Sequence, residues 1–187
     1  MQDFDYVVTA SELDALTLES NLVHAHMPFY NILLKDGKAF PYLKINTKED
    51  FPLVVLTRRI KNDGALYFGP FFGKVRIADL MQIISHTFML RDCALNIKEG
   101  GKPKRVCLNY HIGKCLAPCG GHVNKEVYKK EVDNVISFLK GDTALAKSIL
   151  TEKMMKCAQL EQFEKALEFK ESLQLLDNLN NLIITDL

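Results

Sequence analysis

Apolar residues recur at three- and four-residue spacing along much of the chain, which predicts amphipathic helices. Ser11 and Asn124 are expected to cap two of them, and Gly141 to end the second. Glu161 and Gln162 are read as a tight corner between the last two helices, which would then run antiparallel. The helices are predicted over residues 11–27, 77–88, 125–140, 143–160 and 163–179.

Shorter runs of β-branched and aromatic residues predict strands over residues 4–8, 30–34, 42–45, 52–59 and 65–68. The dipeptides Asp36-Gly37 and Asp63-Gly64 are hairpin signals. They predict that the second and third strands pair, and that the fourth pairs with the fifth. The pattern therefore indicates an α+β fold, with a small antiparallel β-hairpin and helix module between residues 35 and 92.

Composition narrows the class of protein. The 187 residues are 48% hydrophobic and 25% charged, which is typical of a globular chain. No apolar run approaches the roughly 20 residues of a membrane span, and the acidic start does not resemble a signal peptide. We expect a cytoplasmic protein without a membrane partner, in which the five cysteines stay reduced.

The net charge of +1 conceals an uneven distribution. Residues 1–34 carry five acids and no Lys or Arg, residues 35–147 carry 20 basic and 11 acidic residues, and residues 148–187 are acidic again. A basic middle is typical of a surface that meets phosphates, although ordinary solvated charge is an alternative. Arg58 and Arg59 end a predicted strand, where one of them is expected to face a phosphate.

The segment 93–123 loses all periodicity and holds four of the five cysteines. A long irregular stretch in a compact protein is either disordered or held by something. Four thiolates could hold zinc, or one iron each of a 4Fe–4S cluster, and the absence of paired C-x2-C knuckles favours the cluster. His111 could replace one ligand. The thiols are Cys93, Cys107, Cys115 and Cys119, and the cations between them are Lys102, Lys104, Arg105 and Lys114.

Three blocks of sequence resemble the C subunit of the bacterial UvrABC excinuclease. They are LTLESNLVHAHMPFYNILLKDGKAFPYLKI, FPLVVLTRRIKNDGALYFGPF and CLNYHIGKCLAPC. The C-terminal LEQFEKALEFKESLQLL resembles that family's UVR motif, a helical hairpin that binds the helicase subunit UvrB. The resemblance implies dual incision of damaged DNA in nucleotide excision repair and the SOS response, with DNA and a UvrB-like subunit as partners and no small-molecule substrate.

The resemblance also assigns residues. Glu19 matches the Mg2+ or Mn2+ ligand of a GIY-YIG nuclease site, and Asn31 matches an Asn near the end of that domain. The four cysteines match the ligands of a 4Fe–4S cluster. In the hairpin, the residues that match the motif or lie next to it are expected to contact the helicase subunit. They are Phe163, Glu164, Ala166, Phe169 and Lys170.

The implied organisation is a GIY-YIG remnant over 1–34, the hairpin and helix module over 35–92, a cluster-binding region over 93–123, a linking helix over 124–147 and a UVR hairpin over 148–187. The family's GIY and YIG tyrosines and its arginine have no match, nor has its RNase-H-like half. We therefore expect a fragment or truncated relative that is inactive alone as a nuclease. The alternative is a metal-containing adaptor that binds a protein partner without DNA.

Overall fold

The structure is a computed structural model. It describes residues 6–9, 15, 18, 19, 22, 23, 26, 28–30, 41–69, 71 and 77–185, with side chains as far as 179. The helix predicted over 11–27 is confirmed at each described position between 15 and 26. The strand predicted over 4–8 is wrong where it can be checked, because Tyr6 to Val8 are exposed and form no strand.

A three-stranded antiparallel sheet follows. It consists of β1 (Tyr42–Ile45), β2 (Val54–Thr57) and β3 (Leu66–Phe68), in the order β2-β1-β3. Leu43 and Ile45 on the central strand are fully buried, and Lys44 between them lies on the opposite face. This alternation is what a sheet with one face on a core and one toward solvent requires.

The predicted pairing of the fourth and fifth strands is wrong, because β2 and β3 lie on opposite sides of β1. Lys44 is paired with Val55 of β2 on one side and with Tyr67 of β3 on the other. The central position lets the mostly buried β1 satisfy its backbone on both sides. The hairpin predicted across Asp36-Gly37 lies outside the described residues.

Four longer helices follow the sheet along the chain. They are α2 (Ile77–Thr87), α4 (Lys125–Leu139), α5 (Ala144–Gln159) and α6 (Phe163–Thr185). The predicted cap is confirmed, since the Asn124 side chain accepts a hydrogen bond from the Val127 amide at 2.9 Å. The predicted corner is also confirmed, with Glu161 in the left-handed region at φ 57°.

One continuous core joins the sheet to all four helices. Phe51 stacks edge-on against Tyr128 of α4, and Phe88 lies against Phe138, with ring centroids 5.4 and 5.9 Å apart. The core extends to Leu150 of α5 and Leu176 of α6, both fully buried. The last two helices are therefore anchored to the rest of the protein.

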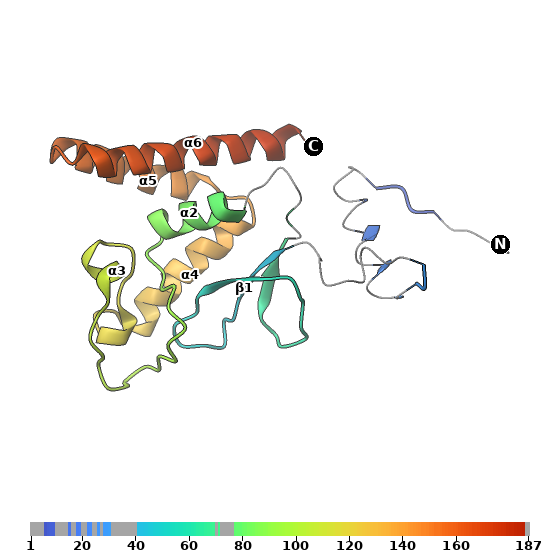
Figure 1. The fold of residues 1–187 in the computed structure, drawn as a ribbon, viewed down its shortest axis with the longest axis horizontal. Coiled ribbons are helices and arrows are strands. Elements are labelled where there is room, and N and C mark those ends of the chain that lie inside the picture. The colour runs from blue at the N-terminus through green and yellow to red at the C-terminus, as the bar shows by residue number, and fades with distance from the viewer. Residues whose placement is uncertain are drawn as a thin grey trace.

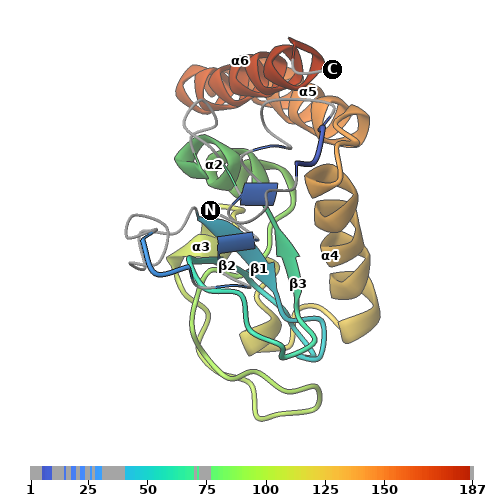
Figure 2. The ribbon, with the colours of Figure 1, turned by 90° about the vertical axis from the view of Figure 1, so that its right-hand side faces the viewer.

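The region 93–123 contains only two short helical elements, α3 (Leu108–His111) and the 3-10 helix η1 (Pro118–Gly120). Its loop around residue 100 projects at the end of the molecule away from α5 and α6 in both views (Figures 1 and 2). The fold thus separates the cysteine-rich end from the helical hairpin. No helix in the described ranges is long and apolar enough to cross a membrane.

Candidate functional site

The four predicted cysteine ligands are free thiols in different environments. Cys115 is buried, Cys93 and Cys119 are half-buried, and Cys107 is exposed. Burial raises the pKa of the Cys115 thiol, and the charges of the other three cysteines raise it further. The four sulfurs are therefore close enough to interact, and each thiolate makes the next one more costly.

The four cysteines fit a metal centre by their chemistry, because thiolates are ligands of metal cations. The amide of Ala117 donates a hydrogen bond to the Cys115 sulfur at 3.3 Å, an interaction that lowers the pKa of this thiol. A bound metal cation would remove the repulsion among thiolates. As placed, no three Cys, His, Asp or Glu side chains in the described part of the chain are grouped tightly enough to hold one metal ion.

Arg91 connects the sheet to the first cysteine, and its side chain is only 3% exposed. Its guanidinium donates to the backbone carbonyls of Cys93, at 2.9 Å, and of Leu95, and its Nε donates to Phe51 O at 2.6 Å. It also pairs with Glu49 at 3.0 Å. One buried cation thus fixes the path of the chain through Cys93.

The other end of the region is held by backbone contacts. The Lys104 amide donates to the carbonyl of Cys119 at 2.7 Å, and the Leu116 amide donates to Met89 O at 3.0 Å. These bonds join the loop to the turn that carries the last two cysteines. A cleft of about 330 Å3 lies between them, lined by Asn96, Ile97, Lys98, Gly101, Lys102, Lys104, Pro118 and Cys119.

The predicted DNA-contacting cations of this region all reach solvent. Lys102, Lys104 and Arg105 are exposed, and Lys114 is half-buried. The structure brings Lys102 and Lys104 together in the cleft. Because they are fixed to the same loop as the thiols, their positions depend on how that loop is held.

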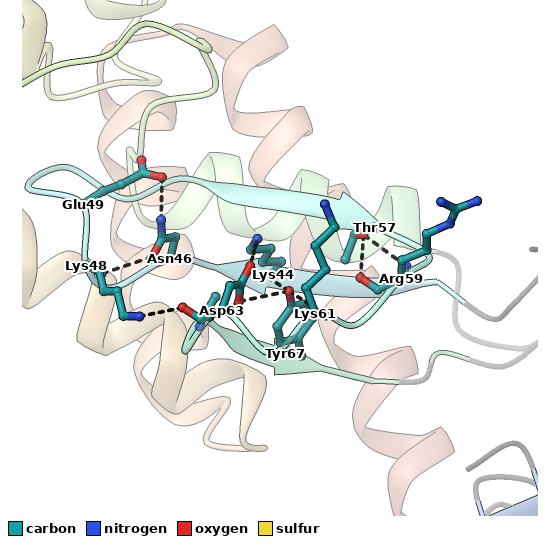
Figure 3. A network of polar contacts seen from close by, with 10 residues as sticks. Lys44, Asn46, Lys48, Glu49, Thr57, Arg59, Lys61, Asp63 and Tyr67 are labelled. Carbon is teal, nitrogen blue, oxygen red and sulfur yellow. Dashed lines mark hydrogen bonds and ion pairs between the residues drawn. The ribbon is translucent and has the colours of Figure 1, made fainter. Parts of the chain in front are cut away.

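The outer face of the sheet carries a second polar cluster, drawn in Figure 3. Lys44 Nζ pairs with Asp63 at 2.5 Å, and the Tyr67 hydroxyl donates to the same carboxylate at 3.2 Å. The hydrogen bond from Lys44 is the largest cause that lowers the pKa of Asp63 to about 2. The cluster fixes the turn between β2 and β3, which Lys48 also contacts through the Asp63 carbonyl at 2.6 Å.

Arg58 and Arg59 lie at the end of β2 and are both exposed. The Thr57 hydroxyl accepts from the Arg59 amide at 3.2 Å and donates to the Arg59 carbonyl at 3.1 Å, which holds the backbone in a tight turn. Figure 3 shows the Arg59 side chain extending beyond the end of β2. The charges of both arginines are therefore available on this face.

Of the two residues assigned to a nuclease site, Glu19 lies in the described part of the chain. Glu19 is helical and exposed. Asn31 lies outside the described residues, as do most residues of 1–40.

The hairpin of α5 and α6 has a docked base and an open tip. At the base, Ser172 is fully buried and its hydroxyl contacts His86 Nδ1 of α2 at 2.8 Å. Lys153 of α5 donates to the carbonyls of His86 and Thr87 at 2.7 and 3.0 Å, which satisfies the end of α2. The hairpin is thus fixed to the middle of the protein.

The tip of the hairpin exposes apolar side chains. Phe163 is 67% exposed, and Met155, Leu160 and Leu167 are each more than half exposed. Of the five predicted partner-contacting residues, Glu164 and Lys170 are also exposed, and Ala166 is half-buried. Phe169 instead turns toward the base, where its ring lies 5.9 Å from that of His86.

Two residues of this region, Arg91 and Lys98, were not predicted from the sequence. Arg91 directly follows the apolar run 88–90 and is followed by Asp92 and Cys93, and a basic residue at the end of an apolar run is a signal of a buried, paired cation. Lys98 belongs to the same basic loop as Lys102 and Lys104, yet its place in the cleft depends on how the loop folds back on Cys119.

Comparisons with known proteins agree with the resemblance. Residues 40–138 match the family model "UvrC/Cho excinuclease, middle domain", and residues 1–32 match the "UvrC-like GIY-YIG domain". These matches place the sheet, α2, the cysteine-rich region and nearly all of α4 within the middle domain.

Similar proteins share most of this chain. UvrABC system protein C of Clostridium kluyveri is 44% identical over 179 residues, which cover 96% of this chain and 29% of the relative. The protein of the same name from Clostridium perfringens strain SM101 is 46% identical over 170 residues, 90% of this chain and 27% of the relative. The chain thus spans less than a third of the length of these relatives. No solved structure matches it. With the family model covering more than half of its residues, the chain belongs to the UvrC/Cho excinuclease family.

Proposed function

We propose that this chain is the central, DNA-binding and partner-binding part of an excinuclease that acts in nucleotide excision repair. The match of residues 40–138 to the excinuclease middle domain carries the proposal. The cations displayed on the sheet and beside the cysteines support it. The relatives share the name UvrABC system protein C, so nothing in them supports the adaptor alternative.

The cysteine-rich region is proposed to hold a 4Fe–4S cluster through Cys93, Cys107, Cys115 and Cys119, with Zn2+ as the alternative. The electrostatic effect of the other three cysteines on Cys115 and the amide donated to its sulfur support this assignment. When bound, the cluster would supply a fixed centre of charge and the capacity for one-electron transfer. Arg91 would orient the Cys93 backbone, and the Lys104 amide the backbone of Cys119.

DNA is proposed to contact both basic surfaces, the cleft side through Lys102, Lys104, Arg105 and Lys114 and the sheet side through Arg58 and Arg59. Lysine binds a phosphate through the compact charge of its ammonium group, and arginine binds it through the planar fork of donors on its guanidinium group. Such contacts displace counterions, so the binding constant falls as salt rises. We also propose that the tip of the hairpin binds the family's helicase subunit, with Phe163 as the anchor residue.

Salt-dependent DNA binding tests the proposal. We expect fluorescence anisotropy with a labelled duplex to give an affinity that falls steeply between 50 and 200 mM salt, as phosphate-contacting proteins show. The quantity to compare is the slope of log affinity against log salt for the whole chain. A protein that fails to bind DNA even at the lower salt would contradict the repair function.

Anaerobic purification followed by absorption spectroscopy tests the cysteine assignment. For the cluster we expect a broad absorption band at about 400 nm, which is lost when Cys107 is replaced by Ser. A colourless protein that holds zinc would support the alternative. Cys157→Ser is the matched control, since this fifth cysteine lies on α5 away from the region.

No cleavage of DNA by this chain alone is expected. A single carboxylate such as Glu19 can hold Mg2+ or Mn2+, which the complete nuclease domain would use, but residues 1–34 provide no arginine to stabilise the developing phosphate charge. A nicking assay with supercoiled plasmid and either metal tests this expectation. Metal-dependent nicking that is lost in Glu19→Gln would overturn it.

A further inference from the structure

The cleft beside Cys119 brings three cations to one place. Lys98, Lys102 and Lys104 line it together with the Gly101 backbone and Cys119. None of the three ammonium groups forms an ion pair in the part of the chain that the structure describes. Lys44, Lys125 and Lys147, by contrast, are each paired with a carboxylate. The cleft is therefore a concentration of uncompensated positive charge.

The acidic groups nearest to it are engaged elsewhere. Asp50 pairs with Lys125 at 2.5 Å and accepts a hydrogen bond from the Glu99 amide at 3.2 Å. Glu99 in turn acts electrostatically on Lys125. Asp50 also interacts electrostatically with Lys98, but its ion pair is with Lys125 of α4, and no carboxylate in the described part of the chain forms an ion pair with a cleft lysine.

The shape of the cleft is set by the loop that surrounds it. The Gly101 amide donates to the Lys98 carbonyl at 3.1 Å, and Gly100 adopts φ 69°, which forms a tight turn between the first two lysines. The Lys104 amide donates to the Cys119 carbonyl at 2.7 Å. The third lysine is therefore fixed to the segment that carries the last cysteine.

We infer that this cleft binds one phosphodiester group of the DNA backbone, with Lys98, Lys102 and Lys104 around it. The inference rests on the proposed DNA-binding function and gives it a defined site. A phosphate carries the negative charge and the acceptor oxygens that three lysines would otherwise lack. A volume of about 330 Å3 is large enough to admit a phosphate group together with the sugar that carries it.

Cys119 makes the site responsive to the state of the cysteines. Because Cys119 lines the cleft and its carbonyl holds Lys104, any change that moves this cysteine moves a wall of the phosphate site. Coupling of two sites is reciprocal. Ligation at the cysteines and phosphate binding in the cleft are therefore expected to influence each other by the same factor.

The experiment compares two triple variants of the whole chain with equal loss of charge. Lys98→Gln/Lys102→Gln/Lys104→Gln empties the cleft of cations. Lys129→Gln/Lys130→Gln/Lys140→Gln removes three exposed lysines on or next to α4. The cleft variant should bind a DNA duplex roughly tenfold more weakly, with a salt slope smaller by about one, while the control stays near the parent.

Lysine footprinting supplies a second readout that does not depend on a variant's folding. Acetylation of the parent protein is followed by mass spectrometry, with the duplex, with inorganic phosphate or without ligand. Protection of Lys98, Lys102 and Lys104 relative to Lys140 by the duplex supports the site. Protection by inorganic phosphate at equal concentration would instead make it a site for free phosphate, and would overturn the assignment to DNA.

Failure of the inference is distinct from failure of the proposed function. If the parent binds DNA in a salt-dependent way and the cleft variant binds equally well, the cleft is not the site, yet the function stands. If the parent does not bind DNA at all, the function fails too. Equal lysine protection in metal-loaded and in metal-free protein would refute the coupling to Cys119.

Discussion

Arg91 shows how much a single buried side chain decides in this protein. Its guanidinium serves three carbonyls and one carboxylate, and its own amide donates to the hydroxyl of Tyr128 at 3.0 Å. The Tyr128 hydroxyl in turn donates a hydrogen bond to the Pro52 carbonyl at 2.8 Å. Burial without these partners would be costly, so the residue and its acceptors stabilise one another.

Replacement of Arg91 by Met is expected to lower the free energy of unfolding by on the order of 3 kcal/mol, because several buried acceptors lose their donors at once. Urea unfolding followed by circular dichroism measures the change. Arg105→Met serves as the control, since Arg105 is exposed and surface changes of this kind stay within about 0.5 kcal/mol. Equal stability of the two variants would contradict the role given to Arg91.

The Lys44–Asp63 pair predicts a dependence of stability on pH. The pKa of Asp63 is lowered to about 2 in the folded protein, below the 3.8 of a free aspartate. The carboxylate therefore stabilises the fold above pH 3.8, and this contribution is lost as the pH falls toward 2. The expected effect is modest and weakens with salt, because the pair is partly exposed to solvent.

Comparison of the parent with Asp63→Asn tests this expectation. The variant should be less stable at neutral pH, and thermal unfolding should show the difference shrinking below about pH 3.8. Asp133→Asn, an exposed carboxylate on α4, provides the control. A difference that is independent of pH would point to the packing of the turn rather than to charge.

Among the elements, the contact between α2 and α6 is the joint that fixes the hairpin. Burial lowers the pKa of His86, and the neighbouring Lys114 and Lys153 lower it further, while Glu168 raises it. The imidazole is thus favoured in its neutral form beside Ser172. Because the folded pKa is depressed, this contact stabilises the fold above pH 6.5, and the stabilisation is lost as the pH falls below that value.

Hydrogen exchange measured between pH 7.5 and pH 5 is expected to show α6 opening more readily at the lower pH. The protection of residues 168–176, corrected for the intrinsic exchange rate, is the quantity to follow. His86→Gln cannot be charged and should abolish the change. Protection that declines equally in the variant would exclude the histidine as the cause.

The tip of the hairpin carries its own prediction. Phe163 is exposed on α6, and its replacement by Ala should weaken binding of the helicase subunit by on the order of 2–4 kcal/mol if it anchors the interface. Isothermal titration with the purified partner measures this. Leu145→Ala, an exposed apolar residue at the other end of the hairpin, should leave the affinity unchanged.

At the scale of the whole molecule, the cysteine-rich region and the core are stabilised by different means. The core consists of buried apolar side chains, whereas the region 93–123 is irregular and held by backbone bonds, Arg91 and the thiols. Loss of the proposed cluster should therefore loosen residues 93–123 and leave α2, α4 and the sheet protected. Hydrogen exchange before and after anaerobic iron chelation checks this, and uniform loss of protection would contradict it.

Local patterns sufficed for features whose cause lies within a few residues. The helices α2, α4, α5 and α6 were predictable because apolar spacing, the Asn124 cap and the corner at Glu161 are written in neighbouring positions. The grouping of cysteines between 93 and 119 and the uneven charge are likewise properties of the linear chain.

Only the tertiary structure decided which segments meet. The order β2-β1-β3 could not be read locally, because strand pairing depends on burial of β1 against helices far along the chain. The same holds for Arg91 reaching Phe51, and for Lys98 lying near Cys119. Local patterns specify elements because their interactions are short in sequence, whereas long-range contacts form only when the whole core excludes water.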